Sequence, residues 1–415
     1  MNSGDSNMTA DLHFDVLIVG AGLVGGAMAC ALAEHPACEA LSIGLIEASE
    51  PAASPSGTEF DPRVVALTHA SQELLEDIGI WHDVLRQRAC AYERMHVWDA
   101  EGTGDIQFDA SEVQRECLGH IVENSVITSL LWRKMQDHPG IELLHPAQLS
   151  QLSHNPRDGA SLIELADGRS VAAKLLIAAD GAHSKVRGIL NMETREWDYG
   201  HSAIVSTVTT SEPHQFTAWQ RFLEIGPLAF LPLQVGSQAD FDEYHSSIVW
   251  SAKTEVAQEL MALSDEAFCQ RLGDAFEGRL GDVTAVAKRF SFPLRQRHAK
   301  EYILPGVALI GDAAHTIHPL AGQGVNLGFL DVIALSEEII RACRRDLPLN
   351  EPSILKRYQR NRKWHNLGMM AVMEGFKTLF GSDDLPLRWL RNEGMRRVNN
   401  LGALKNLIVK QAMGL

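Results

Sequence analysis

Residues 14–34 contain the pattern that most restricts the fold of this chain. An apolar run, Phe14–Val19, is followed by the glycine-rich stretch GAGLVG at residues 20–25 and by an alanine-rich stretch that reaches about Glu34. The run is typical of a buried parallel strand, and the first glycine permits a tight turn into a helix. The second glycine lets the backbone approach a pyrophosphate, the third lets the helix pack on the strand, and the helix N-terminus offers free N–H groups. The motif therefore predicts a dinucleotide-binding turn, with its glycines at Gly20, Gly22 and Gly25.

The same region has a second interpretation as a membrane-spanning helix. Val16–Ala33 runs for 18 residues without a charge, which is close to the length that crosses a bilayer. Clustered glycines in its middle and acidic residues on both flanks disfavour this interpretation, because membrane helices are anchored by Lys or Arg. We therefore expect a strand, a turn and a helix here.

A second apolar run, Leu41–Ile46, ends in Glu47, about 22 residues after the last glycine of the turn. In dinucleotide-binding proteins an acid in this place accepts hydrogen bonds from the ribose hydroxyls. A glycine motif alone is weak, and the alternative is that these glycines serve helix packing only. With a strand before it, a helix after it and Glu47 beyond, the motif predicts that adenosine binds here.

Two later apolar runs also end in an aspartate. Leu175–Ala179 precedes the pattern DGxxSxxR at residues 180–187, and Val307–Ile310 precedes GDAAH at residues 311–315 and HPLAGQGVN at residues 318–326. An aspartate and a glycine after a strand most often form a simple turn. Ligands of open α/β sheets, however, lie at the carboxyl ends of the strands, so both aspartates can accept bonds from ligand hydroxyls. Glycines that open a helix can present N–H groups to a carbonyl or an anion.

The order GxGxxG, DGxxSxxR and GDAAHxxxPxxGQGxN resembles the flavoprotein aromatic hydroxylases of the p-hydroxybenzoate hydroxylase fold. Four stretches are similar, more narrowly, to the ubiquinone-biosynthesis hydroxylases, which add ring hydroxyls to polyprenylated phenols. These stretches are residues 61–67, 118–124, 226–233 and 318–328. The resemblance extends over nearly the whole chain, and it implies FAD as the cofactor and an FAD-dependent monooxygenase as the activity.

The resemblance also implies the fold class. We expect a mixed α/β protein in which a Rossmann-like FAD-binding domain carries an inserted antiparallel-sheet substrate domain and a C-terminal helical region. The expected ranges are 12–75, 100–190 and 290–345 for the FAD-binding domain, 76–99 and 191–289 for the substrate domain, and 346–415 for the helical region.

Apolar and alternating runs within residues 197–255 favour antiparallel strands. In this fold such a sheet would wall the substrate pocket opposite the flavin. Phe222, Phe230 and Leu231 are candidates for lining that pocket, and core packing is the simpler explanation for each of them taken singly.

The positions that match cofactor-binding positions of the family are Gly20, Gly22, Gly25, Glu47, Arg63, Asp180, Arg187, Gly311, Asp312, Gly324, Val325 and Asn326. The resemblance implies that Glu47 holds the adenosine ribose, Asp312 the ribityl chain, and Asp180 with Arg187 the region near the pyrophosphate. It also implies that Arg63 approaches the flavin, while an ordinary surface or ion-pair role for this arginine stays open.

The positions that match the catalytic loop of the family are Pro319, Gly322, Gln323 and Gly324. The resemblance implies that the two glycines and Gln323 lie beside the isoalloxazine ring, and that Pro319 shapes the pocket where oxygen meets the flavin. A helix from about Val325 would direct the positive end of its dipole at the ring and stabilise the negative charge of reduced flavin. Asn326 is more typical of a residue that caps or orders the helix start than of a substrate contact.

The chemistry of the family is reduction of FAD, formation of a flavin C4a-hydroperoxide with O₂, and transfer of one oxygen to an electron-rich phenol. NADPH or NADH is the expected electron donor, but no second nucleotide-binding motif is visible in the sequence, so a separate reductase stays open. No metal-binding motif is found, and we predict no metal site. His315 and His318 could help deprotonate a phenol, although structural hydrogen bonding is the preferred interpretation.

Three other functions fit parts of the pattern. A nicotinamide dehydrogenase explains the glycine motif and Glu47, but it leaves the motifs at Asp180 and Asp312 without a purpose. A flavoprotein reductase of prenyl lipids shares the fold, and O₂ consumption distinguishes a hydroxylase from it. A non-catalytic flavin-binding scaffold of a quinone-making assembly is the third alternative.

Charge is distributed unevenly along the chain. The net charge is −16, yet residues 351–415 contain twelve Lys or Arg and five Asp or Glu. A basic stretch with interleaved Leu and Trp is typical of helices that rest on anionic lipid or dock a partner, and a solvated helix face is the alternative. The six scattered cysteines favour a reducing compartment. We expect a cytoplasmic protein, peripheral at the inner face of the membrane or in a ubiquinone-biosynthesis assembly, with no nucleic-acid partner.

Overall fold

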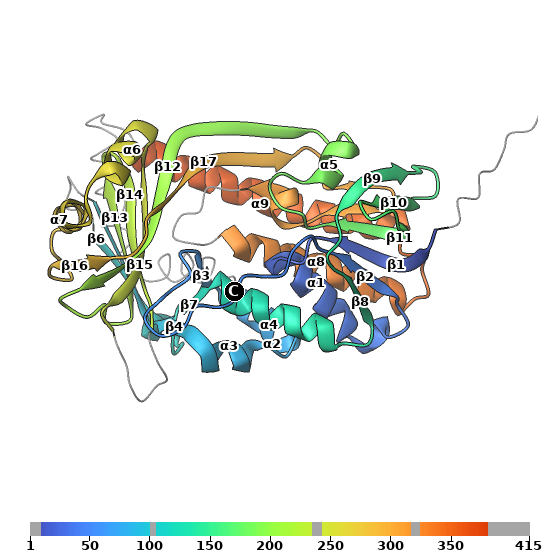
Figure 1. Ribbon diagram of the computed structural model, residues 1–415, viewed down its shortest axis with the longest axis horizontal. Helices are drawn as coiled ribbons and strands as arrows, with labels where there is room; N and C mark the ends of the chain where they lie inside the picture. Colours follow the sequence, from blue (N-terminus) through green and yellow to red (C-terminus); the bar gives the residue numbers. More distant parts are fainter. Residues whose placement is uncertain (1–9, 100–104, 235–242, 317–323, 381–415) are drawn as a thin grey trace, which may run out of the picture.

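Two large sheets, each with its own hydrophobic core, organise the protein (Figure 1). The first sheet and its helices lie at one end of the molecule. The second sheet lies at the other end with helices α6 (Thr254–Ala262) and α7 (Asp265–Ala275) (Figure 1). The mixed α/β fold expected from the sequence is confirmed. The computed structural model describes residues 10–99, 105–234, 243–316 and 324–380.

The first sheet is built around β1 (Leu12–Val19), which pairs in parallel with β2 (Ile43–Ile46) on one side and β11 (Ser170–Ala178) on the other. β8 (Ile141–Leu144) extends the sheet beyond β2, and β19 (Val307–Leu309) extends it beyond β11. Their apolar runs are buried because both faces of a parallel sheet are covered. The four predicted strands are confirmed, and their carboxyl ends meet at one edge of the sheet because the strands are parallel.

Antiparallel strands flank this parallel core. β18 (Ile303–Leu304) pairs with β19, β10 (Ser161–Leu165) pairs with β11, and β9 (Leu149–His154) pairs with β10. The helices that pack on the first sheet or on one another are α1 (Leu23–Ala33), α2 (His69–Asp77), α3 (Trp81–Arg88), α4 (Asn124–Asp137), α8 (Gly324–Cys343) and α9 (Pro352–Phe380).

The N-terminal motif forms the predicted strand, turn and helix as β1 and α1. The interpretation of this segment as a membrane-spanning helix is therefore wrong. Among the described residues, no helix is both long enough and apolar enough to cross a membrane.

The second sheet has the strand order β20-β17-β12-β15-β14-β13-β5-β6, with β16 beside β12. It is antiparallel apart from one parallel pair, β13 and β5. The long, paired strands β12 and β17 run from the second sheet toward the first (Figure 1). The strands are β5 (Arg94–Asp99), β6 (Asp105–Asp109), β12 (Thr194–Thr210), β13 (Thr217–Leu223), β14 (Gly226–Pro232), β15 (His245–Lys253), β16 (Val283–Val286), β17 (Phe290–Ala299) and β20 (His315–Thr316).

The expected antiparallel strands within residues 197–255 are present as parts of β12 to β15. The sheet also takes strands from well outside that range, because β5, β6 and β17 complete it. The chain leaves the first sheet after β11 and rejoins it with β18 and β19, so the first sheet is discontinuous in sequence. The numerical domain boundaries stay predictions.

Alternation along β14 separates two of the candidate pocket residues onto opposite faces of the second sheet. Phe230 is fully buried toward α6 and α7, and its ring stacks on Phe276 with 3.9 Å between centroids. Leu231 faces the small sheet of β3 (Val64–Leu67), β4 (Ala89–Tyr92) and β7 (Gly119–Glu123). Core packing therefore explains Phe230 and Leu231, while Phe222 is half-buried near the end of β13.

Replacement of Phe230 tests this assignment to the core. We expect Phe230→Ala to lower the free energy of unfolding by about 3–5 kcal/mol, because it leaves a cavity beside Phe276. Urea denaturation followed by tryptophan fluorescence measures the loss, and Phe292→Ala, at a ring that is 43% exposed, is the control. An unchanged stability would contradict the assignment.

Candidate functional site

The glycine turn after β1 has the geometry of a phosphate-binding loop. Gly20 has a φ of +102°, and a Cβ on Gly25 would lie 1.9 Å from the carbonyl oxygen of Gly20. A Cβ on Gly22, in contrast, would meet no atom within 4 Å among the described residues. Gly22 is the N-cap of α1, and no side chain caps this helix end. The first N–H groups of α1 therefore face a space that an anionic group can enter.

Glu47 lies directly beside this turn. It follows β2, and one carboxylate oxygen accepts a hydrogen bond from the N–H of Ala21 at 2.7 Å. The other oxygen accepts from the N–H groups of Ala48 at 2.8 Å and Ser49 at 3.2 Å. The structure thus brings together the two elements that the sequence predicts for the adenosine half of the cofactor, and the ribose contact itself stays a prediction.

Asp180 follows β11, the other neighbour of β1. Its Oδ2 accepts a hydrogen bond from the N–H of Val186 at 3.2 Å, at the start of α5 (Lys185–Ile189). Its Oδ1 is buried and has no hydrogen-bond partner within the described part of the chain. A buried carboxylate oxygen without a donor is costly, and a hydroxyl or N–H of a bound ligand would satisfy it.

Arg187 is buried, and its guanidinium holds two loops together. It donates to the carbonyl oxygen of Ala313 at 2.7 Å, after β19, and to that of Ala182 at 2.7 Å, after β11. Arg297 of β17 donates to the same Ala182 carbonyl and to Glu196 at 2.6 Å. Burial and the nearby Arg297 lower the pKa of Arg187. Arg187 thus positions the loops beside Asp180, and its expected place near the pyrophosphate stays a prediction.

Asp312 lies in the short helix η3 (Gly311–Ala313) that follows β19. Gly311 has a φ of +58°, and a Cβ there would lie 3.1 Å from the side chain of Val24 in α1. The Asp312 side chain is accessible to solvent, yet surrounding protein desolvates it and raises the pKa of its carboxyl. A position in an open recess explains both properties, because the carboxylate there is within reach of a ligand while surrounding protein limits its hydration.

His315 is buried after η3, and its Nε2 lies 2.6 Å from Oδ2 of Asp331 in α8. This contact supports the structural hydrogen-bonding role that the sequence favoured for His315, whereas His318 lies outside the described residues. Sequence reasoning missed Asp331. The available signal was an aspartate in the middle of the apolar stretch NLGFLDVIAL.

Only part of the predicted catalytic loop can be placed. Pro319, Gly322 and Gln323 lie outside the described residues. Gly324 is the first residue of α8, and a Cβ on it would meet no atom within 4 Å among the described residues. Val325 follows in the first turn of α8 and is half-buried.

Asn326 orders the start of α8 through contacts with a different element. Its Oδ1 accepts hydrogen bonds from the N–H of Thr68 at 3.2 Å and the hydroxyl of Ser71 at 2.7 Å. Its Nδ2 donates to the carbonyl oxygen of Ala66 at 2.7 Å. The side chain thus ties α8 to the turn between β3 and α2. An ordering role was expected, but Asn326 lies inside α8 and is not its cap.

Arg63 precedes β3 and is held through its backbone. Its N–H donates to Oδ1 of Asp61 at 2.9 Å, and its carbonyl accepts from the N–H of Asn124 at 2.9 Å. Oδ2 of Asp61 also accepts from the N–H of Ser125 at 3.1 Å. The side chain of Arg63 is exposed. Both a flavin contact and an ordinary surface role therefore stay open.

The four motifs form one continuous edge. Because β19, β11, β1 and β2 are adjacent in that order, their carboxyl ends present Asp312, Asp180, the glycine turn and Glu47 in a row. An extended dinucleotide requires acceptors for its hydroxyls and a helix N-terminus with open space for its phosphates. This edge offers both, together with an unpartnered buried oxygen. The residues present therefore fit FAD, and the expected places of its adenosine end at Glu47 and its ribityl chain at Asp312 stay predictions.

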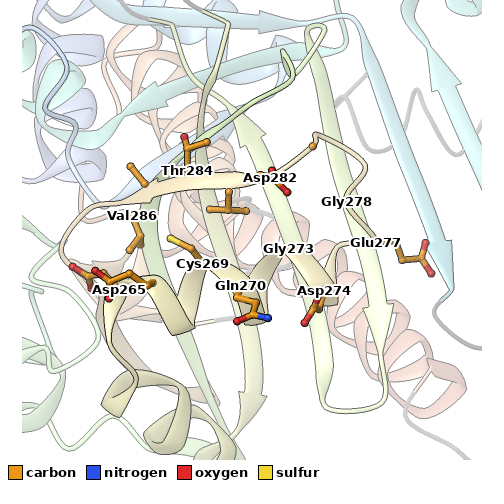
Figure 2. A pocket seen from close by; sticks show the side chains of 14 residues that line it. Asp265, Cys269, Gln270, Gly273, Asp274, Glu277, Gly278, Asp282, Thr284 and Val286 are labelled. Atoms are coloured by element: carbon orange, nitrogen blue, oxygen red, sulfur yellow. The ribbon is translucent and has the colours of Figure 1, made fainter.

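A separate cavity of about 800 Å³ lies between α7 and β16, with Asp265, Cys269 and Thr284 in its lining (Figure 2). None of the predicted site residues lines it, and two of its acids are paired: Asp265 with Arg289 and Glu277 with Arg221. We assign it no ligand. In the described part of the chain, no three His, Cys, Asp or Glu side chains are grouped so that they could hold a metal ion.

Comparison with known proteins identifies the family. A family model described as FAD binding domain matches residues 13–372. A 3-demethoxyubiquinol 3-hydroxylase of Escherichia coli (strain K12) is 38% identical over 401 residues, which cover 97% of this chain and 98% of that protein. The chain belongs to the FAD-dependent ubiquinone-biosynthesis hydroxylases.

Two further relatives support the same family assignment. The ubiquinone hydroxylase UbiL of Rhodospirillum rubrum is 36% identical, covering 99% of this chain and 92% of that protein. The human mitochondrial ubiquinone biosynthesis monooxygenase COQ6 is 33% identical, covering 97% and 93%. Among solved structures, the probable FAD-dependent monooxygenase PqsL of Pseudomonas aeruginosa superposes with a TM-score of 0.75 at 23% identity, covering 93% of this chain and all of that one. FAD as cofactor and the activity of an aromatic monooxygenase, both expected from the sequence, are confirmed.

Two alanine replacements in the hydroxylase separate phosphate binding from folding. We expect Gly22→Ala to leave the stability of the apoprotein unchanged but to raise the FAD dissociation constant about tenfold, because its Cβ enters the open space beside α1 that the second glycine leaves for the pyrophosphate. Gly25→Ala should lower both stability and FAD affinity, since its Cβ meets the Gly20 carbonyl at 1.9 Å. Thermal melting of apoprotein and quenching of flavin fluorescence are the measurements. Normal FAD affinity in Gly22→Ala would contradict this position of the phosphates.

Proposed function

We propose that this hydroxylase adds a hydroxyl group to the aromatic ring of a polyprenylated phenol in ubiquinone biosynthesis. The observation that carries the proposal is identity along nearly the full length of relatives named as 3-demethoxyubiquinol 3-hydroxylase, ubiquinone hydroxylase and ubiquinone biosynthesis monooxygenase. FAD, when bound, supplies the chemistry that activates O₂ for transfer to the ring.

In this proposal the residues of the chain bind the cofactor and position the aromatic ring of the substrate. Glu47, the glycine turn, Asp180 and Asp312 hold successive parts of FAD in this proposal. The start of α8 at Gly324 directs its dipole toward the isoalloxazine ring and stabilises negative charge there. Pro319, Gly322 and Gln323, which lie outside the described residues, would act beside the flavin as the family resemblance implies. Exclusion of water from the flavin site favours oxygen transfer over loss of hydrogen peroxide.

The electron donor in this proposal is NADPH or NADH. The sequence shows no second dinucleotide-binding motif, so the nicotinamide would bind at the surface of the flavin site without its own domain. Anaerobic mixing with each nucleotide tests this, because a competent donor bleaches the visible absorbance of the flavin. A flavin that stays oxidised with both nucleotides points to a separate reductase.

Product analysis tests the substrate class. We expect cells without this hydroxylase to accumulate a prenylated precursor that lacks one ring hydroxyl, as identified by mass spectrometry. The purified holoenzyme, supplied with that precursor and a reductant, should consume O₂ and yield a product that carries isotopic label from O₂. A product with a saturated prenyl chain and no O₂ consumption would support the reductase alternative, and normal quinone levels in cells without the protein would contradict both.

Contact with the membrane surface is a second part of the proposal, because a prenylated substrate resides in lipid. The described part of the basic C-terminal region supports it: Lys356, Arg360 and Trp364 recur at four-residue spacing on α9, all three are exposed, and Trp364 is 74% exposed. Tryptophan with Lys or Arg on one face is typical of helices at a lipid surface. We therefore propose a peripheral position at the cytoplasmic face of the membrane, or docking in a quinone-making assembly.

Vesicle binding tests this membrane contact. We expect the protein to sediment with vesicles that contain anionic lipid and not with neutral vesicles, because each basic residue near an anionic surface contributes about 1 kcal/mol. Replacement of Arg388, Arg391, Arg396 and Arg397 by Gln should weaken binding and lower activity in cells while leaving activity on a soluble phenol intact. Equal sedimentation with both vesicle types, or unchanged cellular activity of the variant, would contradict the idea.

A further inference from the structure

A single buried carboxylate holds the turn that carries Asp312. Asp331 is fully buried in α8, and its Oδ2 accepts hydrogen bonds from the N–H of Gly311 at 2.9 Å and from Nε2 of His315 at 2.6 Å. Asp312 lies between these two residues in sequence. The turn is therefore held to α8 on both sides of Asp312, and the Asp312 side chain remains accessible.

Arg362 of α9 binds the other oxygen of the same carboxylate. Its Nε donates to Oδ1 of Asp331 at 2.7 Å, and its Nη2 donates to the carbonyl oxygen of Leu327 at 3.2 Å and to Oδ1 of Asn366 at 2.8 Å. Leu327 lies in the first turn of α8, three residues after Gly324. Arg362 thus contacts both the residue that anchors the Asp312 turn and the start of the helix expected to face the flavin.

The polar contacts continue from Arg362 back to the same turn. Nδ2 of Asn366 donates to the hydroxyl of Tyr302 at 3.1 Å, and this hydroxyl lies 2.8 Å from Nε2 of His298. His298 in β17 is paired in register with His315 in β20. Burial, together with nearby His315, lowers the pKa of His298 to about 4, so its ring is neutral at neutral pH. These contacts therefore link Arg362, through Asn366 and Tyr302, to the strand that pairs with His315.

The charges within this network depend on one another. Burial opposes ionisation of Asp331, but the contacts with His315 and Arg362 outweigh it and lower the pKa of this carboxyl. An ionised carboxylate only accepts hydrogen bonds, so His315 must carry a proton on Nε2. Loss of the arginine would leave a buried carboxylate short of positive charge, and such a group relaxes toward water or becomes protonated.

We propose that Arg362 is a positioning residue of the FAD site, which acts through Asp331 to hold Asp312 and the start of α8 in the geometry that binds the flavin half of FAD. The proposal depends on FAD binding and not on which phenol is hydroxylated. Its tests therefore use FAD itself and stay informative even if the proposed substrate is wrong.

Replacement of Arg362 by Met and by Lys tests the proposal in the purified holoenzyme. We expect Arg362→Met to raise the FAD dissociation constant about tenfold, the size of effect that supporting residues have on the groups they orient, and to shift the visible absorbance and reduction potential of bound flavin. Arg362→Lys keeps the charge but loses the planar fork, so its effects should be intermediate. Arg345→Met is the matched control, because Arg345 is an exposed arginine just beyond the end of α8 and should leave all readouts unchanged.

A double replacement distinguishes positioning from simple stabilisation. Asp331→Asn combined with Arg362→Met leaves neither buried charge unpaired, so thermal stability should recover. If Arg362 acts through Asp331, the double variant should bind FAD no more weakly than Arg362→Met alone and keep its altered flavin spectrum. Recovery of normal FAD affinity together with stability, or additive losses in the double variant, would overturn the proposal. If Arg362→Met does not fold, a normal FAD affinity and flavin spectrum in Arg362→Lys overturn it equally.

Discussion

Parallel pairing of β1 with β2 on one side and with β11 on the other sets the position of the cofactor site. It aligns the carboxyl ends of strands that are far apart in sequence, and β19 extends the alignment beyond β11. The glycine turn, Glu47, Asp180 and Asp312 therefore meet at one edge. The close approach of Gly25 to Gly20, in which a Cβ would lie 1.9 Å from a carbonyl oxygen, lets α1 begin directly at this edge.

Buried polar side chains hold the loops and helices around that edge in place. Arg187 joins the loops after β11 and β19, Asn326 joins α8 to the turn after β3, and Asp331 joins α8 to the Gly311–His315 turn. Each of these groups would be costly to bury without its partners. Since the partners lie on loops around the cofactor site, the cost of leaving a group unpaired disfavours displacement of those loops.

The two faces of the second sheet pack against different elements. One face packs on α6 and α7 through residues such as Phe230 and Trp250, and the opposite face, with Leu231, packs toward the small sheet of β3, β4 and β7. The long strands β12 and β17 connect this sheet to the cofactor site, because Arg297 of β17 donates a hydrogen bond to the Ala182 carbonyl after β11. One pair of strands thus belongs to the second sheet and also contacts a loop of the cofactor site.

The local elements could be predicted from the amino-acid sequence: the buried strands, the glycine turn, the acid after β2 and the two aspartates after later strands. Apolar runs and glycines are local properties, so they can be read without knowledge of contacts. The contacts of Arg187 and Asn326, the opposite orientations of Phe230 and Leu231, and the pairing of Asp331 with Arg362 follow from the packing of the folded chain. These outcomes depend on contacts between residues that are 31 to more than 250 positions apart, and no local pattern encodes them because the sheet topology chooses the partners.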